Sequence, residues 1–186
     1  MMNNFNKLGK IITKILEVFH WVGVGIMIAA IICAIVSPDL VSKFVEFDVK
    51  ENYGVDMSIY GFEVHTNLKD GAIDKLTFVL FGIGAVLILS LVAMIFRNLY
   101  LIFKKSENST PFVKDNARMV KEIGIFSISI PIVGLIMSII IRLAIGPDAV
   151  EISTNLSGIA MGIIVLCLTQ FFIYGIKLEK DVDGLL

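Results

Sequence analysis

Few residues of this sequence have the types and spacing that chemistry requires. Its two histidines, His20 and His65, are far apart in the chain, and its two cysteines, Cys33 and Cys167, each lie within an apolar run. The metal-binding pattern HExxH, the phosphate-binding pattern GxxxxGK[ST] and the nucleophile pattern GxSxG are all absent. We therefore expect no catalytic, metal or cofactor site and no enzymatic activity. We expect both cysteines to be small buried hydrophobic residues.

One charge falls inside an apolar stretch. Arg142 follows Ile123 by a length of helix of about 28 Å at 1.5 Å per residue, which places it at a membrane boundary. A long cationic side chain can reach the headgroups from there. Asp148 or Glu151 could form an ion pair with it across a short loop.

The strongest cluster of positive charge lies in residues 97–122. After the helix-breaking run Ser106–Ser109, Thr110 can cap a new helix with a proline at its first position. Cationic side chains follow on that helix. We expect a partner contact made by Thr110, Pro111, Phe112, Lys114 and Arg118.

The elements that would position these residues are membrane helices. Hydrophobic residues make up 56% of the 186, charged residues only 18%, and the mean hydropathy is +0.86. Four apolar stretches, at about 18–36, 76–96, 123–145 and 156–176, can each cross a hydrocarbon core about 30 Å thick. The first is longer than the apolar core of a signal peptide, so we expect a retained helix. The sequence predicts a single all-α integral membrane domain over residues 1–186, with four transmembrane helices and a small extracytoplasmic β-hairpin.

The hairpin is expected in the loop 37–75. Two runs rich in aromatic and β-branched residues, Phe44–Lys50 and Ser58–His65, flank the turn-prone Asn52 and Gly54. An isolated hairpin is marginal in water, so it should pack on the helix ends or on a partner. Residues 1–17 are amphipathic, which predicts a segment that lies on the membrane surface or extends the first helix.

Charge sets the expected orientation. Eleven of the 16 Lys and Arg residues lie in the N-terminal segment, in residues 97–122 and in the C-terminal tail. Lys and Arg are concentrated on cytoplasmic segments, so both termini and residues 97–122 are expected in the cytoplasm of a bacterial cell. The loop 37–75 is acidic and is expected outside.

Small residues predict close helix contacts. Gly134 and Ser138 have the spacing for such a contact, and so do Gly158 and Gly162. These pairs favour packing of the third and fourth helices, and they could also support a homo-oligomer.

Two stretches resemble a known family. They are Phe96–Phe103, followed by Thr110-Pro111-Phe112, and Phe171–Glu179. Both resemble a family of bacterial four-helix membrane proteins that is catalogued only as a domain of unknown function. The resemblance implies the same architecture over nearly the full length. It also implies a partner, because members are often encoded beside a small Cro/C1-type helix-turn-helix regulator.

The leading hypothesis is a non-enzymatic membrane accessory or regulatory protein. It would sit in the lipid bilayer and tether a small DNA-binding regulator at its cytoplasmic face, without binding nucleic acid itself. One alternative is an immunity or envelope-stress protein, whose acidic outer hairpin meets cationic membrane-active peptides. Another is a small transporter or channel subunit, for which four helices would need an oligomer or a partner.

Overall fold

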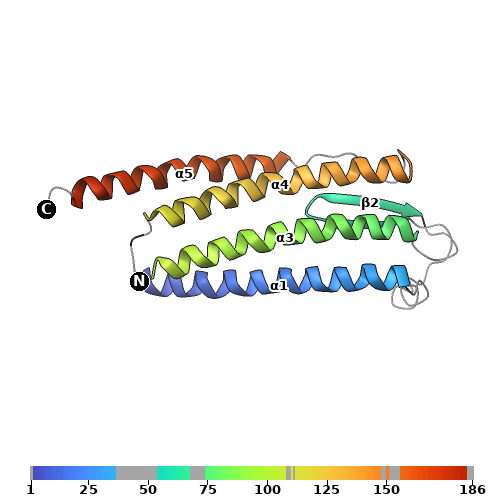
Figure 1. Cartoon of the computed structure of the whole chain (residues 1–186), viewed down its shortest axis with the longest axis horizontal. Helices are drawn as coiled ribbons and strands as arrows, with labels where there is room; N and C mark the ends of the chain where they lie inside the picture. Colours follow the sequence, from blue (N-terminus) through green and yellow to red (C-terminus); the bar gives the residue numbers. More distant parts are fainter. Residues whose placement is uncertain are drawn as a thin grey trace. The chain divides into compact units, whose positions relative to one another are not determined.

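The computed structural model of the chain describes residues 2–36, 54–67, 74–107, 110, 112–147, 150 and 156–183. In this part of the chain it has four long helices and one antiparallel two-stranded sheet (Figure 1). In chain order the elements are α1 (Met2–Val36), β1 (Gly54–Ile59), β2 (Phe62–Asn67), α3 (Lys75–Lys105), α4 (Lys114–Ala144) and α5 (Leu156–Asp183).

All four helices are long and apolar enough to cross a bilayer, so the chain is a multi-pass membrane protein of helical class, as the sequence predicts. Each helix also extends beyond its apolar stretch. Helix α1 is continuous from Met2, so the N-terminal residues extend the first span. Helices α3 and α4 extend into the cationic region, ending at Lys105 and beginning at Lys114.

The first residues of α3 and the residues before α4 differ in how their side chains form hydrogen bonds. Helix α3 is capped by Asp74, whose carboxylate accepts hydrogen bonds from the Thr77 backbone N–H at 3.0 Å and the Thr77 hydroxyl at 2.9 Å. The prediction that Thr110 caps α4 is wrong, because that helix begins at Lys114. The Thr110 hydroxyl instead donates to the Glu179 carboxylate on α5, at 3.1 Å.

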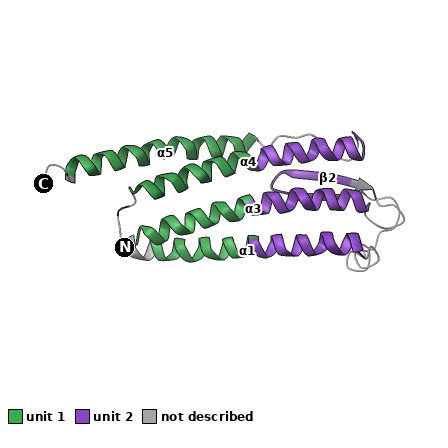
Figure 2. Cartoon of the chain, viewed as in Figure 1, with its two compact units in different colours: residues 1–20, 91–129, 156–186 green, residues 21–90, 130–155 purple. Residues whose placement is uncertain are grey.

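The chain divides into two compact units (Figure 2). Unit 1 contains residues 1–20, 91–129 and 156–186. Within it, Gly9 of α1 lies so close to the Phe103 ring of α3 that a Cβ there would be 2.8 Å from the ring. Gly124 of α4 and Gly162 of α5 make a second close contact.

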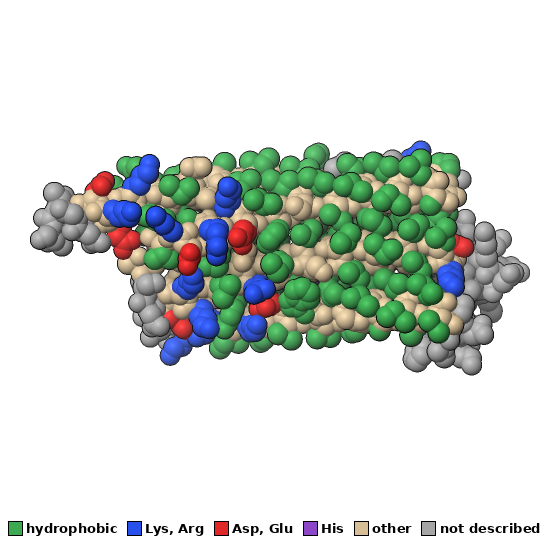
Figure 3. Space-filling model, viewed as in Figure 1, with side chains coloured by type: hydrophobic (Ala, Val, Ile, Leu, Met, Phe, Trp, Pro, Cys, Tyr) green, Lys and Arg blue, Asp and Glu red, His purple; other side chains and the backbone are tan. Residues whose placement is uncertain are grey.

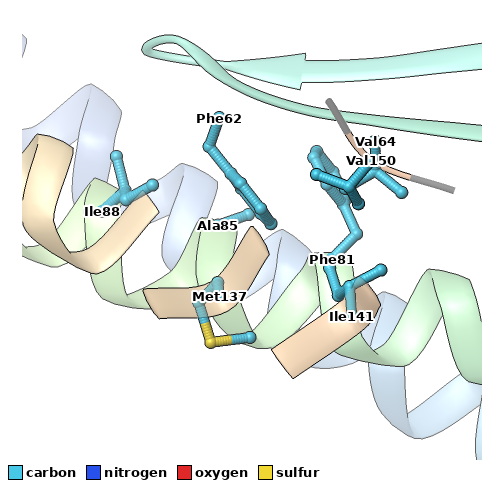
Figure 4. Packing of buried hydrophobic residues seen from close by; sticks show 8 residues of the cluster. All are labelled: Phe62, Val64, Phe81, Ala85, Ile88, Met137, Ile141 and Val150. Carbon is cyan, nitrogen blue, oxygen red and sulfur yellow. The ribbon is translucent and has the colours of Figure 1, made fainter. Parts of the chain in front are cut away.

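Unit 2 contains residues 21–90 and 130–155, and most of its buried side chains are apolar. Its buried cluster consists of Phe62, Val64, Phe81, Ala85, Ile88, Met137, Ile141 and Val150 (Figure 4). The Phe62 side chain is only 2% exposed, and its ring stacks on Phe81 with centroids 5.4 Å apart. The same ring presses on Gly84 of α3, and its Cβ lies near Gly134 of α4. The hairpin therefore contributes the central side chain of this core.

The structure corrects the position of the hairpin. The turn is formed by Tyr60 and Gly61, inside the run expected to be one strand, and Ile59 pairs with Phe62. Both turn residues have positive φ, 49° and 81°, the geometry of a two-residue hairpin turn. The other expected strand, Phe44–Lys50, lies outside the described residues. The sheet also packs along the sides of α3 and α4 through Phe62, and not on the helix ends as expected.

Candidate functional site: a cationic groove in unit 1

A groove between the first turns of α4 and the last turns of α5 is the best candidate site. Its volume is about 440 Å³. Its lining consists of Lys114, Ala117, Arg118 and Lys121 from α4, and Thr169, Ile173, Ile176, Lys177 and Lys180 from α5. We call it the cationic groove. Figure 3 shows Lys and Arg side chains gathered over the surface of unit 1.

Glycine contacts hold the two walls of the groove together. A Cβ at Gly162 would lie 2.9 Å from the Gly124 carbonyl oxygen, so only glycine permits this approach of α5 to α4. At the other end, the Phe112 ring packs on Gly175 and lies 5.8 Å from the Phe172 ring, centroid to centroid. These contacts fix the spacing of the walls before any ligand is present.

The carboxylates next to the cationic groove interact with residues other than its lysines. Glu122 accepts a hydrogen bond from Asn98 at 3.0 Å and lies 3.7 Å from the Arg118 guanidinium. Asp115 pairs with Lys105 at 2.6 Å, and this hydrogen bond, together with the Lys105 charge, lowers the pKa of the Asp115 carboxyl. Arg118 is therefore only loosely paired.

The lysines of the groove have no ion-pair partner in the part of the chain that the structure describes. Within the ranges that the structure describes, no carboxylate lies at ion-pair distance from Lys114, Lys121, Lys177 or Lys180. All four side chains are exposed, whereas Ala117 and Thr169 on the floor are buried. An apolar floor with a cationic rim can hold an anionic, amphipathic ligand.

Unit 1 also has a polar interior that the sequence analysis missed. Thr13, Glu17 and His20 of α1 are each 7% exposed or less, and Asn98 and Asn116 are also buried. The His20 Nδ1 donates to the Leu16 carbonyl at 2.7 Å, since a carbonyl can only accept. Apolar side chains of the same helix face outward; these are Leu8, Ile11, Ile12, Ile15, Val18 and Phe19. The spacing 10, 13, 17, 20 of polar residues was the available signal, because it places them on one helical stripe.

The structure places the residues expected to contact a partner in different positions. Lys114 and Arg118 line the cationic groove, while Thr110 and Phe112 bind α5 beside it. Pro111 lies outside the described residues. The α5 half of the groove, with Lys177 and Lys180, was not foreseen as part of the site.

The expected boundary and packing residues are placed as follows. Arg142 is exposed in the last turn of α4, and its proposed partners Asp148 and Glu151 lie outside the described residues. Gly134 faces Phe62, and the buried Ser138 hydroxyl donates to the Gly134 carbonyl at 2.9 Å. Gly158 lies on α5, one turn before Gly162. The counterpart of Gly162 on α4 is Gly124.

The cysteines contradict their prediction. Both Cys33 and Cys167 are exposed on the helix surfaces, where an apolar thiol can face lipid as readily as core. In the part of the chain that the structure describes, no group of three or more His, Cys, Asp and Glu side chains is arranged to hold a metal ion.

Comparison with known proteins adds no assignment. No protein-family model, no curated protein and no solved structure matches the chain. The family resemblance therefore stays a prediction that rests on the residues quoted for it.

Proposed function

We propose that the chain is a non-enzymatic membrane accessory protein whose cationic groove captures an acidic amphipathic segment of a cytoplasmic regulator. One observation supports this most directly: four lysines without ion-pair partners among the described residues surround an apolar floor. An amphipathic helix can lay its apolar side on Ala117 and Ile173 while its carboxylates meet the rim. Charge on the rim would then select the partner and speed its association.

The regulator and the membrane face follow from the sequence. The family resemblance suggests a small helix-turn-helix protein encoded nearby. The concentration of Lys and Arg in unit 1 favours a cytoplasmic location for the groove in a bacterial cell membrane. Tethering would control the regulator by keeping it away from DNA.

The test is binding of the purified neighbouring regulator to the full chain in lipid nanodiscs. The double variant Lys114→Gln/Arg118→Gln removes two rim charges and should weaken binding about tenfold or more, corresponding to about 1.4 kcal/mol. The matched control Lys7→Gln/Lys104→Gln removes two exposed charges from unit 1 outside the groove. It should leave the affinity within about twofold, because exposed charges away from an interface contribute little.

Two results would contradict this proposal. Equal weakening by both double variants would show general electrostatic attraction without a groove. Unchanged binding of the groove variant would place the contact elsewhere.

A second candidate function, a subunit of a transporter or channel, draws support from a different observation. The hairpin of unit 2 exposes polar side chains beside apolar helix segments. Solute flux through proteoliposomes would test it, and a monomeric protein without flux would remove it.

A further inference from the structure

The hairpin lies at a depth where hydrocarbon is expected. Its Phe62 ring contacts Gly84, nine residues into α3, or about 14 Å from the helix start at 1.5 Å per residue. Its tip, with Tyr60 and Gly61, borders a small recess beside Pro131. That proline lies 13 residues before the end of α4, or about 20 Å inward. Since the hydrocarbon core is about 30 Å thick, the tip reaches about half of its depth.

The helix segments along the hairpin carry no charge that would mark a water boundary. Residues 76–90 of α3 and 130–141 of α4 contain no Asp, Glu, Lys or Arg. Lys75 and Arg142 bracket these segments at one end. The bilayer surface therefore lies near those two residues, and the hairpin extends inward from it.

The hairpin has two chemically different faces. Phe62 and Val64 point onto α3 and α4 and are almost completely buried (Figure 4). Asp56, Ser58 and Glu63 are exposed on the other face. On that face Asp56 is paired in register with His65, whose Nδ1 also contacts its carboxylate, and Ser58 is opposite Glu63.

Such a face cannot lie against lipid tails. A two-stranded sheet has backbone N–H and C=O groups along both edges, and non-helical backbone at membrane depth occurs only against protein or water. The Glu63 carboxylate, one residue from Phe62, carries the same restriction. The Asp56 side chain is 72% exposed and that of His65 is 40% exposed, so the residues that the structure describes do not enclose them.

We propose that water follows the outward face of the hairpin from the Lys75 end of unit 2 to its tip, forming an aqueous vestibule about halfway through the membrane. Asp56 and Glu63 make its wall anionic, so it admits cationic solutes and disfavours anionic ones. This goes beyond regulator capture, since it concerns a separate surface and a different class of ligand.

The experiment measures cysteine reactivity in nanodiscs of zwitterionic lipid, whose two faces are both open to reagent. In a Cys33→Ser/Cys167→Ser background, single cysteines replace Ser58 on the outward face, Val64 on the inward face and Leu87 on the exposed side of α3, about one helical turn beyond Gly84. The reagents are a trimethylammonium methanethiosulfonate and its anionic sulfonate analogue. Both are water-soluble and react with the thiolate.

The expected result is a charge-selective reaction at one position. Ser58→Cys should react about 100-fold faster than Val64→Cys or Leu87→Cys, since thiolate forms in water and is disfavoured in hydrocarbon. A unit charge about 5 Å away in water changes the local concentration of an ion several-fold, so the cationic reagent should be favoured about tenfold. Glu63→Gln should reduce this preference to about threefold, because Asp56 remains.

Three results would overturn the proposal. Reaction at Ser58→Cys as slow as at Leu87→Cys would mean that protein, for instance a second copy of the chain, covers this face. Equal reaction at Ser58→Cys and Val64→Cys would mean that the hairpin is not seated on the helices. A fast reaction without charge preference would remove the cation selectivity. None of these readouts depends on the cationic groove.

Discussion

The interiors of the two units differ in their share of polar side chains. Unit 2 buries mainly apolar side chains such as Phe62 and Ile88, whereas unit 1 buries Glu17 and His20 beside apolar residues such as Val120. In a water-soluble protein, an apolar core such as that of unit 2 would be the usual arrangement. In lipid the tails are as apolar as any core, so helices associate through close packing and polar contacts. Unit 1 uses close packing and polar contacts together, and unit 2 uses an aromatic side chain fitted to a glycine of α3.

The difference teaches that hydrophobicity does not identify the inside of a membrane protein. In unit 1 the apolar stripe of α1 faces outward and the polar stripe faces α3, and Lys10 bonds Glu107 just beyond the end of that helix. In unit 2 shape decides, because Gly84 leaves room for the Phe62 ring. The following four predictions test whether each unit depends on the kind of contact assigned to it.

The largest effect is expected from Phe62→Ala in unit 2. It should lower the free energy of unfolding by about 3–5 kcal/mol, because it leaves a cavity where the hairpin meets α3 and α4. SDS titration of the purified protein measures this value. Phe171→Ala deletes the same ring from an exposed position on α5 and should change stability by about 0.5 kcal/mol or less. Equal losses of stability in the two variants would mean that Phe62 is not the centre of the unit 2 core.

A smaller effect is expected from Gly162→Ala in unit 1. The added methyl group meets the Gly124 carbonyl oxygen and the Ile128 backbone nitrogen, which cannot move as a side chain can. Such overpacking costs about 1–3 kcal/mol. The control is Gly25→Ala, because a Cβ there meets nothing within 4 Å. If unfolding of both variants requires the same SDS fraction, the α4–α5 contact is not close.

The Lys10–Glu107 pair should contribute about 1 kcal/mol of coupling, since its side chains are partly buried and joined by two hydrogen bonds. A double-mutant cycle with Lys10→Met and Glu107→Gln measures this coupling. Added salt should weaken it. A coupling of zero at low salt would remove polar pairing as a source of stability in unit 1.

The smallest effect is expected at Asp115. Because Lys105 lowers the pKa of its carboxyl in the folded chain, the ionised form is favoured by folding. The contribution is fully present above the ordinary value of 3.8 and is lost as the pH falls through the lower folded value. The stability difference between wild type and Asp115→Asn should therefore shrink on acidification. A difference that grows instead would reverse the assigned sign.

Hydropathy was sufficient to predict the four helices, because twenty apolar residues in succession have few other uses. It could not place the hairpin turn. The run Ser58–His65 is continuous in β-forming residues, and only the unusual backbone of Tyr60 beside Gly61 interrupts it. Nor could hydropathy predict that the hairpin packs on α3 and α4, because this depends on the space that Gly84 leaves for the Phe62 ring.

The sequence predicted the α4 side of the candidate site and missed the α5 side. Charge on a short stretch was enough to select Lys114 and Arg118, because both follow one helix start. The contribution of Lys177 and Lys180 depends on which face of α5 meets α4, and this is set by Gly124 against Gly162. The small-residue pattern pointed to Gly134 and Ser138 for that contact. Spacing along one helix cannot specify the facing residue on another.

The packing of the hairpin on α3 and α4 has a consequence for biogenesis. Phe62 leaves the ribosome before either helix that holds it, and Met137 of its core follows 75 residues later. At about 5–20 residues per second, translation of that interval takes about 4–15 s. During this delay the two strands can pack on α3 alone, because Met137 and Ile141 of α4 have not yet been made. The core of unit 2 is therefore completed only when the third span enters the membrane.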